Sequence, residues 1–197
     1  MKTLSFISRT GAEISTFSDD FAALRIAVFR EFPYLYEGSM EYEKNYLQTY
    51  AQSDSSMMFA VFDEGRMIGT TTCLALKDET EEVQRPFHQA GIDVSPVFYF
   101  GESLLLPEYR GLGIGHRFFD KREAHAKSFG TYQTTSFCAV VRPQDHPLKP
   151  KHYRTNDAFW RKRGYQKNEN LKCTMSWLDR DETAPSPKEL VFWTRDI

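Results

Sequence analysis

The residues of this chain whose spacing best fits ligand chemistry form a glycine-rich turn. An apolar stretch ends at Pro107, and Arg110 then precedes three glycines at alternate positions, Gly111, Gly113 and Gly115. Glycine permits positive φ angles and a close approach of the backbone to a ligand. A helical pattern follows at once, and the free N–H groups and partial positive charge of a helix N-terminus favour an anion such as a diphosphate. The sequence therefore predicts an anion-binding turn for a nucleotide-type ligand.

Two better-known phosphate-binding turns do not fit the same stretch. A Walker loop has Gly-Lys-Ser/Thr at the start of its helix, where this chain has His116 and Arg117. A dinucleotide-binding turn spaces its glycines as GxGxxG, whereas a single residue separates Gly113 from Gly115. The residue types at the start of the helix exclude the Walker loop, and the glycine spacing excludes the dinucleotide-binding turn.

The order of proline, arginine and glycines resembles the signature of the GNAT superfamily of acyl-CoA-dependent N-acyltransferases. In that signature an arginine or glutamine is followed by two residues, a glycine, one residue, and a glycine or alanine, and Arg110, Gly113 and Gly115 match it. The resemblance extends over most of the chain, from an early helix and a hairpin to a closing stretch at 156–165. It implies a mixed α/β fold, in which helices flank a mostly antiparallel central sheet of six to seven strands.

The resemblance also implies where acetyl-CoA, the co-substrate of the family, would bind. The amides of the turn would hold the CoA pyrophosphate. The backbone just before the turn would pair with the pantetheine arm and polarise the thioester carbonyl. An asparagine would lie along the pantetheine, with a tryptophan packed beside it. The cofactor residues implied in this way are Leu105, Leu106, Arg110, Gly111, Gly113, Ile114, Gly115, His116, Asn156 and Trp160.

The reaction implied is direct attack of a primary amine on a thioester. An alkyl amine with a pKa near 10.4 is almost wholly protonated at neutral pH, and freeing its lone pair costs about 4 kcal/mol. The site therefore needs a proton acceptor, directly or through water. Glu102 is the candidate, because it is an isolated carboxylate in an apolar stretch before Pro107, where family members often carry an acidic residue. Exposure to solvent and pairing with a buried arginine are the alternatives for Glu102.

The acid that would protonate the leaving thiolate is less clearly marked. Family members often use a tyrosine at the position where this chain has Trp160, and an indole is not a useful acid near pH 7. Tyr153 or Tyr165 could replace it, or bulk water could reprotonate a thiolate whose pKa lies near 8.5. The missing tyrosine also motivates an alternative function, a non-catalytic module that binds or senses acyl-CoA.

Residues beyond the turn leave the acceptor open. By the resemblance, the aromatic segment 32–36 flanks the acceptor groove; otherwise it caps the core. The basic loop 142–155 either contacts the CoA 3′-phosphate or an anionic acceptor, or is simply solvated. The acidic run at 78–82 is interpreted as a solvated face. The acceptor is an amine on a small molecule or a peptide, and a homodimer is left open.

The elements that must position these residues follow from periodicity and turn chemistry. A helix is expected at 21–32, capped by Ser18 and ended by Pro33, and a second helix at 42–50. Residues 57–62 and 67–76 read as a hairpin. Pro86 is expected to open a short helix that Gly91 closes. Further strands are expected at 97–106, 134–141, 171–178 and 190–195, with helices at 118–129 and 156–163.

The composition narrows the class of protein. At 197 residues the chain fits one domain, taken as 1–197, and its net charge of -2 gives no basic field for nucleic acid. Three cysteines without paired spacing suggest free thiols in a reducing compartment. No apolar run approaches the ~20 residues that span a membrane, and no secretory signal is recognised, so a cytoplasmic location is expected. The histidines show no metal-ligand spacing, so no metal is expected.

Overall fold

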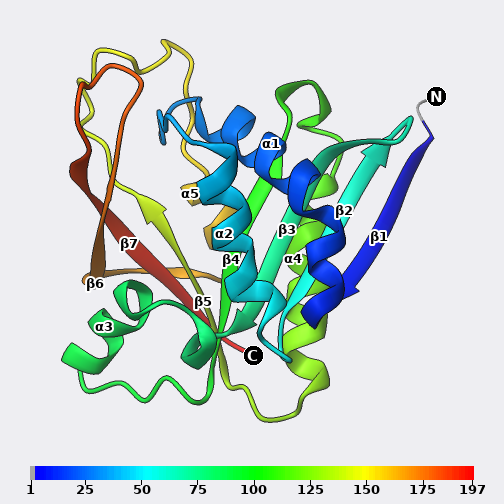
Figure 1. Cartoon of the computed structure of the whole chain (residues 1–197). Helices are drawn as coiled ribbons and strands as arrows, with labels where there is room; N and C mark the ends of the chain where they lie inside the picture. Colours follow the sequence, from blue (N-terminus) through cyan, green and yellow to red (C-terminus); the bar gives the residue numbers. More distant parts are fainter. Residues whose placement is uncertain (1–2) are drawn as a thin grey trace.

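The computed structural model describes residues 3–197, which form a seven-stranded sheet in the order β1-β2-β3-β4-β5-β7-β6 (Figure 1). The strands are β1 Leu4–Thr10, β2 Met57–Asp63, β3 Arg66–Ala75, β4 Val97–Leu105, β5 Thr134–Val140, β6 Gln166–Trp177 and β7 Ser186–Asp196. The helices are α1 Ser18–Phe29, α2 Met40–Ala51, α3 Glu81–Gln89, α4 Ile114–Ser128 and α5 Asp157–Lys162, with short 3-10 helices η1 Gly11–Phe17, η2 Leu76–Asp78 and η3 Pro107–Tyr109. The predicted fold, a mostly antiparallel sheet flanked by helices, is confirmed.

The strands β4 and β5 separate along their length. Among the strands formed by residues 3–197 they are the one parallel pair, and they pair only from Val97 opposite Thr134 to Tyr99 opposite Ser136. Beyond this point the two strands diverge (Figure 1). In the described part of the chain, no strand pairs with residues 100–105 on the side of β5. The sheet is therefore open at its centre, directly before the glycine turn.

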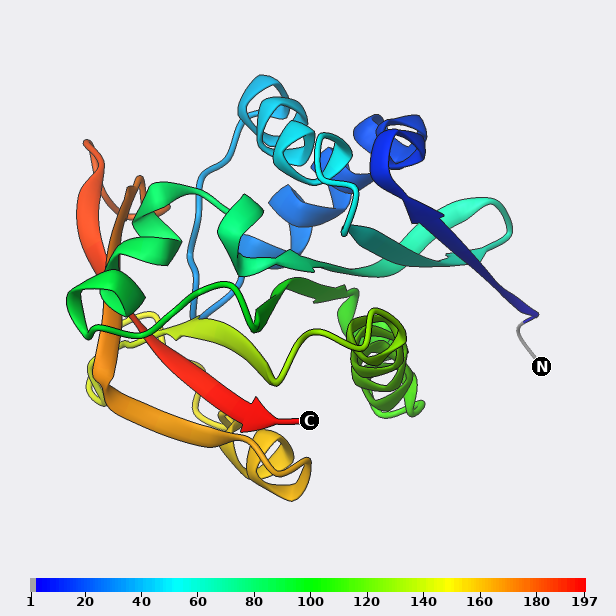
Figure 2. The same ribbon diagram turned by 90° about the horizontal axis from the view of Figure 1, so that it is seen from below.

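Helices cover both faces of the sheet. The helices α1 and α2 lie on one face, and α4 and α5 lie on the other (Figure 2). Phe21 and Leu24 bury one side of α1, and Phe118 and Phe119 bury one side of α4. The two apolar surfaces meet the sheet from opposite directions, and α1 and α4 contact β4 from its two faces.

Some boundaries differ from the sequence-based prediction. Ser18 is the first residue of α1, not its cap, because η1 leads directly into the helix. Pro86 lies inside α3 instead of opening it. A proline there removes one backbone hydrogen bond, but Val83, Pro86 and Phe87 are all buried, and this packing outweighs the loss. Gly91, with φ 70, follows the end of α3 as expected.

Candidate active site

The glycine turn forms an open cradle at the start of α4. Gly111 has φ 81, and Gly113, the N-cap of α4, has φ 79. In this left-handed region a residue with a side chain is strained by about 1–2 kcal/mol. A Cβ atom built at either glycine would meet no protein atom within 4 Å. The space above the turn is therefore free for a ligand, and the backbone conformation explains why glycine stands at both positions.

The amides of the turn point to an anion as that ligand. Within residues 3–197, the N–H groups of residues 111–115 have no intramolecular acceptor. The N–H of His116 differs, because it donates to the carbonyl of Gly113 at 3.1 Å. The free amides are thus those of Gly111 to Gly115, and the predicted contribution of the His116 amide is already used within the helix. Adjacent free amides at a helix N-terminus suit a diphosphate.

Arg110 shapes the turn through its side chain. Its Nη2 lies 2.9 Å from a carboxylate oxygen of Glu31, and its Nε donates to the carbonyl of Leu105 at 3.2 Å. The guanidinium therefore links the turn to the segment after α1 and to the end of β4. This leaves the backbone of the turn as the part that faces a ligand.

Beside the turn, the open edge of β4 presents backbone groups that pair with no other described strand. The N–H of Leu106 donates to Ile68 on the β3 side at 3.0 Å. Because backbone groups of successive residues in an extended chain point to opposite edges, those of Leu105 face the gap between β4 and β5. Of the two leucines expected to pair with an extended ligand, Leu105 is the one placed to do so, through its N–H, because its carbonyl already accepts from Arg110.

Glu102 lies on β4 and is held by two partners. Its Oε2 accepts a hydrogen bond from the hydroxyl of Thr72 at 2.7 Å, and its Oε1 lies 3.3 Å from the Nε of Arg25. The side chain is only 5 % exposed. A buried arginine partner was one of the alternatives raised by the sequence, and the structure contains it. Such a pair does not exclude a role in proton transfer, because Arg25 has a second carboxylate partner.

That second partner is Glu43 on α2, which forms an ion pair with Arg25 and is fully buried. Burial acts to lower the pKa of the Arg25 guanidinium, but the negative charges of Glu102 and Glu43 outweigh burial and raise it. One cation thus faces two carboxylates. The buried group carries a net negative charge, which favours a cationic ligand such as an ammonium ion.

Aromatic rings surround the Arg25 guanidinium. Its central carbon lies 4.5 Å from the ring centre of Tyr46 and 4.8 Å from that of Phe29. Tyr34 stacks on Phe29 at 4.2 Å and on Trp177 at 6.0 Å. The predicted aromatic segment 32–36 therefore lies beside the Arg25–Glu102 pair, and rings of this kind can also contact a cation.

A cysteine stands where β4 and β5 separate. The Sγ of Cys138 lies 3.1 Å from the hydroxyl of Tyr99. Interaction with the sulfur of Cys173, together with burial, raises the pKa of the Cys138 thiol well above its usual value. A protonated thiol is a poor nucleophile. The arrangement therefore favours direct attack by the acceptor over a covalent intermediate on Cys138.

The candidate acids occupy different environments. Tyr153 packs edge-on against Phe32 at 4.7 Å, and burial followed by the charge of Asp157 raises its pKa. Tyr165 is 1 % exposed, and its hydroxyl lies 3.0 Å from that of Thr135. Tyr165 is therefore fixed within the core, whereas Tyr153 lies in the loop beside the aromatic segment.

Trp160 and Asn156 lie in and before α5. Trp160 packs against Phe137 on β5 at 5.0 Å and against Trp193 at 5.1 Å. Asn156 is the exposed N-cap of α5, and its side chain makes no capping hydrogen bond. Trp160 thus packs on β5 and β7, and the side chain of Asn156 is available to a ligand.

Two sequence-based interpretations of charge are corrected. Arg142 is not a free cation of the loop, because its side chain is only 8 % exposed and pairs with Asp179 at 2.6 Å. Glu79, in the run interpreted as a solvated face, is 5 % exposed, and its Oε1 accepts a hydrogen bond from Tyr50. Burial raises the pKa of Glu79 to about 7. In both cases long-range packing, invisible to local charge patterns, buries the group.

The sequence reasoning also missed Arg25 and Glu43. Both occupy positions on the apolar side of their helix: Arg25 follows Phe21 by four residues, and Glu43 precedes Leu47 by four. A charged residue in an apolar stripe is the signal that could have revealed them. Polar side chains that face a core are normally paired, and here they pair with each other.

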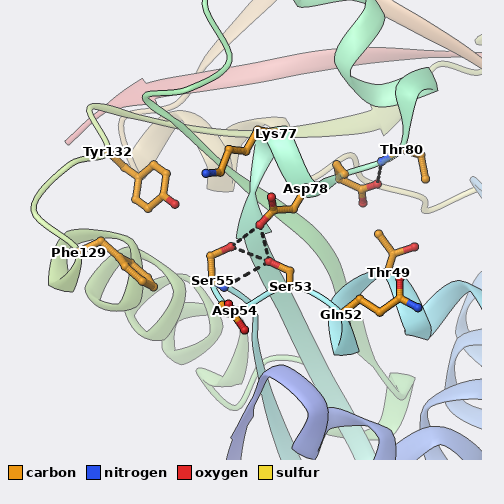
Figure 3. A pocket seen from close by; sticks show the side chains of 11 residues that line it. Thr49, Gln52, Ser53, Asp54, Ser55, Lys77, Asp78, Thr80, Phe129 and Tyr132 are labelled. Atoms are coloured by element: carbon orange, nitrogen blue, oxygen red, sulfur yellow. Dashed lines mark hydrogen bonds between the residues drawn. The ribbon is translucent and has the colours of Figure 1, made fainter.

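A pocket lies away from the turn. It measures about 680 Å³ and is bordered by residues from the end of α2, by η2 and by the segment after α4. Figure 3 shows Ser53, Ser55 and Asp78 joined by hydrogen bonds, with Phe129 and Tyr132 across from them. The turn opens the 15-residue helix α4, so about 22 Å of helix separates the two places.

Within residues 3–197, no cluster of three or more histidine, cysteine or acidic side chains is arranged to hold a metal ion. None of the helices in this described range has the length and apolar character needed to cross a bilayer.

Comparison with known proteins identifies similar sequences and folds. The Acetyltransferase (GNAT) family matches residues 21–150. No curated protein sequence matches the chain. Among solved structures, the chain is similar to a ribosomal-protein-alanine N-acetyltransferase from Brucella melitensis, with 11 % identity, a TM-score of 0.62, and 97 % of this chain and 99 % of that one covered.

Two further structures have the same fold. An N-acetyltransferase from Staphylococcus aureus Mu50 is 13 % identical, with a TM-score of 0.61 and 98 % of each chain covered. A GNAT-family acetyltransferase from Streptococcus pneumoniae is 12 % identical, with a TM-score of 0.57 and 98 % of this chain and 100 % of that one covered. At these identities the likeness concerns the fold.

Proposed function

Because this chain belongs to the GNAT family of acetyltransferases, we propose that it transfers the acetyl group of acetyl-CoA to a primary amine of a small molecule or peptide. The observation that carries the proposal is the row of free amides at residues 111–115 beside the open edge of β4. The free amides suit the diphosphate of acetyl-CoA, and the open strand edge suits its extended pantetheine arm. The buried Glu102 lies on the same strand.

The proposed cofactor site uses backbone groups for the CoA and side chains for packing. The amides of residues 111–115 would hold the pyrophosphate, each through a charge-assisted hydrogen bond worth about 1.5–3 kcal/mol. The exposed edge at Leu105 would pair with the pantetheine, and Asn156 and Trp160 would line its path. When bound, acetyl-CoA supplies the thioester that the amine attacks.

The proposed role of Glu102 is to accept a proton from the acceptor nitrogen, directly or through water. The net negative charge of Arg25, Glu43 and Glu102 favours binding of the amine as an ammonium ion, which is its form at neutral pH. A carboxylate in contact with that ammonium then helps to free the lone pair. Attack on the thioester is direct, because the Cys138 thiol stays protonated.

We assign Tyr153 a weaker role than proton donor. Its raised pKa lies above the value near 8.5 of a thiol. Full transfer of its proton to a thiolate would cost at least about 2 kcal/mol, since the ordinary tyrosine value is already near 10. A hydrogen bond to the leaving sulfur requires no such transfer. Tyr153 would therefore stabilise the thiolate until water protonates it.

Replacing Tyr153 with phenylalanine is expected to lower kcat about fivefold, because one hydrogen bond of about 1 kcal/mol is lost. The measurement is the rate of thiol release at saturating acetyl-CoA. Tyr42→Phe removes a hydroxyl from an exposed tyrosine on α2 and should leave kcat unchanged. An unchanged kcat in Tyr153→Phe would assign thiolate protonation to water alone.

Replacing Gly113 with alanine is expected to weaken acetyl-CoA binding at least tenfold. The new methyl would enter the space above the turn, where the structure has no protein atom, and φ 79 would strain the backbone. Calorimetric titration with acetyl-CoA measures the effect. Gly130→Ala is the matched control, since Gly130 has φ 69 and equally open surroundings at the other end of α4. Equal loss of affinity in both variants would contradict a ligand at the turn.

The experiment that tests the function is a thiol-release assay with acetyl-CoA and a panel of primary amines. Turnover with an amine supports the proposed acetyltransferase. Binding of acetyl-CoA without turnover of any amine would support instead the acyl-CoA-binding or sensing module, which the tryptophan at position 160 favours. No rise in melting temperature with acetyl-CoA would contradict both functions.

A further inference from the structure

The proposed reaction releases a proton that must leave a buried site. An ammonium acceptor carries three protons on nitrogen, and its amide product carries one. One of the two protons lost ends on the sulfur of CoA, and the other passes to solvent. Glu102 can hold one proton, but it is only 5 % exposed. A route from the site to water is therefore needed if the proposed function holds.

A hydrogen-bonded tyrosine pair leads away from the Arg25–Glu102 pair. The half-buried Tyr46 lies beside Arg25. The central carbon of the Arg25 guanidinium is 4.5 Å from the centre of the Tyr46 ring. The hydroxyl of Tyr46 is 3.1 Å from that of Tyr50, one helical turn later on α2. Tyr50 in turn donates to the Oε1 of Glu79 at 3.3 Å. Three groups thus form one continuous chain of hydrogen bonds.

The sheet makes room for this chain at Gly101. A Cβ atom at this position of β4 would collide with the hydroxyl of Tyr50, and it would lie 2.7 Å from Oγ1 of Thr72. Thr72 is the residue that donates to Glu102 at 2.7 Å. The absence of a side chain at Gly101 therefore brings the tyrosine pair close to the partners of Glu102.

The far end of the chain reaches the large pocket. Glu79 is among the residues that border this cavity of about 680 Å³, which contains Ser53, Ser55 and Asp78 on one side (Figure 3). The second carboxylate oxygen of Glu79 accepts from the amide of Thr80. One oxygen thus faces the tyrosines while the residue as a whole borders an opening to solvent.

We propose that Tyr46, Tyr50 and Glu79 form a proton relay from the acceptor nitrogen to the pocket beside η2. Glu102 takes the first proton of the ammonium, which frees the lone pair for attack. After the attack a second N–H bond breaks as its proton joins the Tyr46 oxygen. The Tyr46 hydroxyl proton moves to Tyr50, and the Tyr50 hydroxyl proton moves to the Glu79 carboxylate. Both tyrosines end neutral, and the electron pair of the broken N–H bond stays on nitrogen. Glu79 becomes a carboxylic acid, which passes its proton to water in the pocket.

The electrostatics of the chain support these steps. Burial raises the pKa of Glu79 to about 7, so this carboxyl can both take and release a proton near neutral pH. Burial raises the pKa of both tyrosines well above its usual value, so each stays neutral between transfers. Three elements packed near Glu79 carry titratable groups that interact with it: Tyr46 and Tyr50 on α2, Glu102 and Tyr99 on β4, and Cys138 on β5. Lys77 and Asp78 of η2 are next to Glu79 in the chain and border the same pocket.

The test is the pH dependence of kcat in Glu79→Gln. The wild-type kcat should rise through an inflection near pH 7, because Glu79 must be ionised to accept a proton. In Glu79→Gln we expect kcat at pH 8 to fall about tenfold and this inflection to disappear. Tyr50→Phe, which interrupts the chain but keeps Glu79, should give the same two changes. Glu82→Gln removes an exposed carboxylate of the same acidic run and should keep the wild-type profile.

The outcomes separate the relay from the proposed function. A kcat in Glu79→Gln that falls equally at every pH, with the inflection preserved, would show a structural role and overturn the relay. An unchanged kcat in both Glu79→Gln and Tyr50→Phe would overturn it as well. Failure of the wild-type protein to acetylate any amine would overturn the proposed function and the relay with it. Melting temperatures with and without acetyl-CoA confirm that each variant is folded and binds the co-substrate.

Discussion

Replacing Glu102 with glutamine is expected to lower kcat at least about 100-fold while the affinity for acetyl-CoA stays the same. General base catalysis contributes about 10²–10⁴ to a rate, and the amide of glutamine cannot take the proton of the acceptor nitrogen. The glutamine oxygen can still accept from Thr72, which donates to Glu102 at 2.7 Å. Arg25 keeps its other partner, Glu43. The fold should therefore tolerate the change.

The matched control for this prediction is Glu43→Gln. Glu43 shares Arg25 with Glu102 and is more deeply buried, but it lies on α2 and not on β4. If the loss in Glu102→Gln came from a weakened ion pair, Glu43→Gln would lower kcat as much. We expect Glu43→Gln to change kcat less than tenfold. Steady-state rates at saturating acetyl-CoA and amine, with acetyl-CoA affinity from calorimetry, measure both effects. Full activity in Glu102→Gln would remove Glu102 as the base.

The sequence contained the local parts of the fold, including the glycine turn. The hairpin of β2 and β3 follows from the Asp63-Glu64-Gly65-Arg66 turn, and the cradle at Gly111 and Gly113 follows from their spacing. In each case the decisive information lies within about ten residues. Turn chemistry, periodicity and helix termini act over that range, so these features were predicted correctly.

The buried charges around Arg25 and Glu79 depend on contacts between distant segments. Arg25 and Glu102 are 77 residues apart, and Tyr50 and Glu79 are 29 apart. The local sequence around each of these residues does not reveal its distant partner. For this reason Glu79 was interpreted as exposed and Arg25 was not noticed. The first strand, β1, was not predicted for the same reason. Its residues Phe6 and Ile7 pair with residues of β2, which lies about 50 residues later in the chain. Sheet pairing and ion pairing are decided by tertiary structure.

Replacing Arg25 with methionine is expected to destabilise the fold by about 3–5 kcal/mol at pH 7. Removing one partner from a buried ion pair leaves the other charge without compensation. Here two carboxylates lose their shared cation, and Glu43 and Glu102 are 0 % and 5 % exposed. Methionine keeps much of the side-chain volume between Phe29 and Tyr46, so the loss reflects charge more than packing. For a chain of this size the melting temperature should fall by roughly 10 °C.

Arg30→Met provides the comparison that isolates burial. Arg30 follows α1 and pairs with Glu37, but their side chains are 50 % and 40 % exposed. Exposed pairs contribute about 0–1 kcal/mol. The free energy of unfolding of this variant, measured by urea titration, should therefore lie within about 1 kcal/mol of the wild-type value. The double variant Arg25→Met/Glu43→Gln should regain part of the stability lost in Arg25→Met, because one of the two unpaired carboxylates is removed. If Arg25→Met and Arg30→Met were equally stable, Arg25 would not hold the two buried carboxylates together. The negative site inferred for an ammonium acceptor would then lose its structural basis.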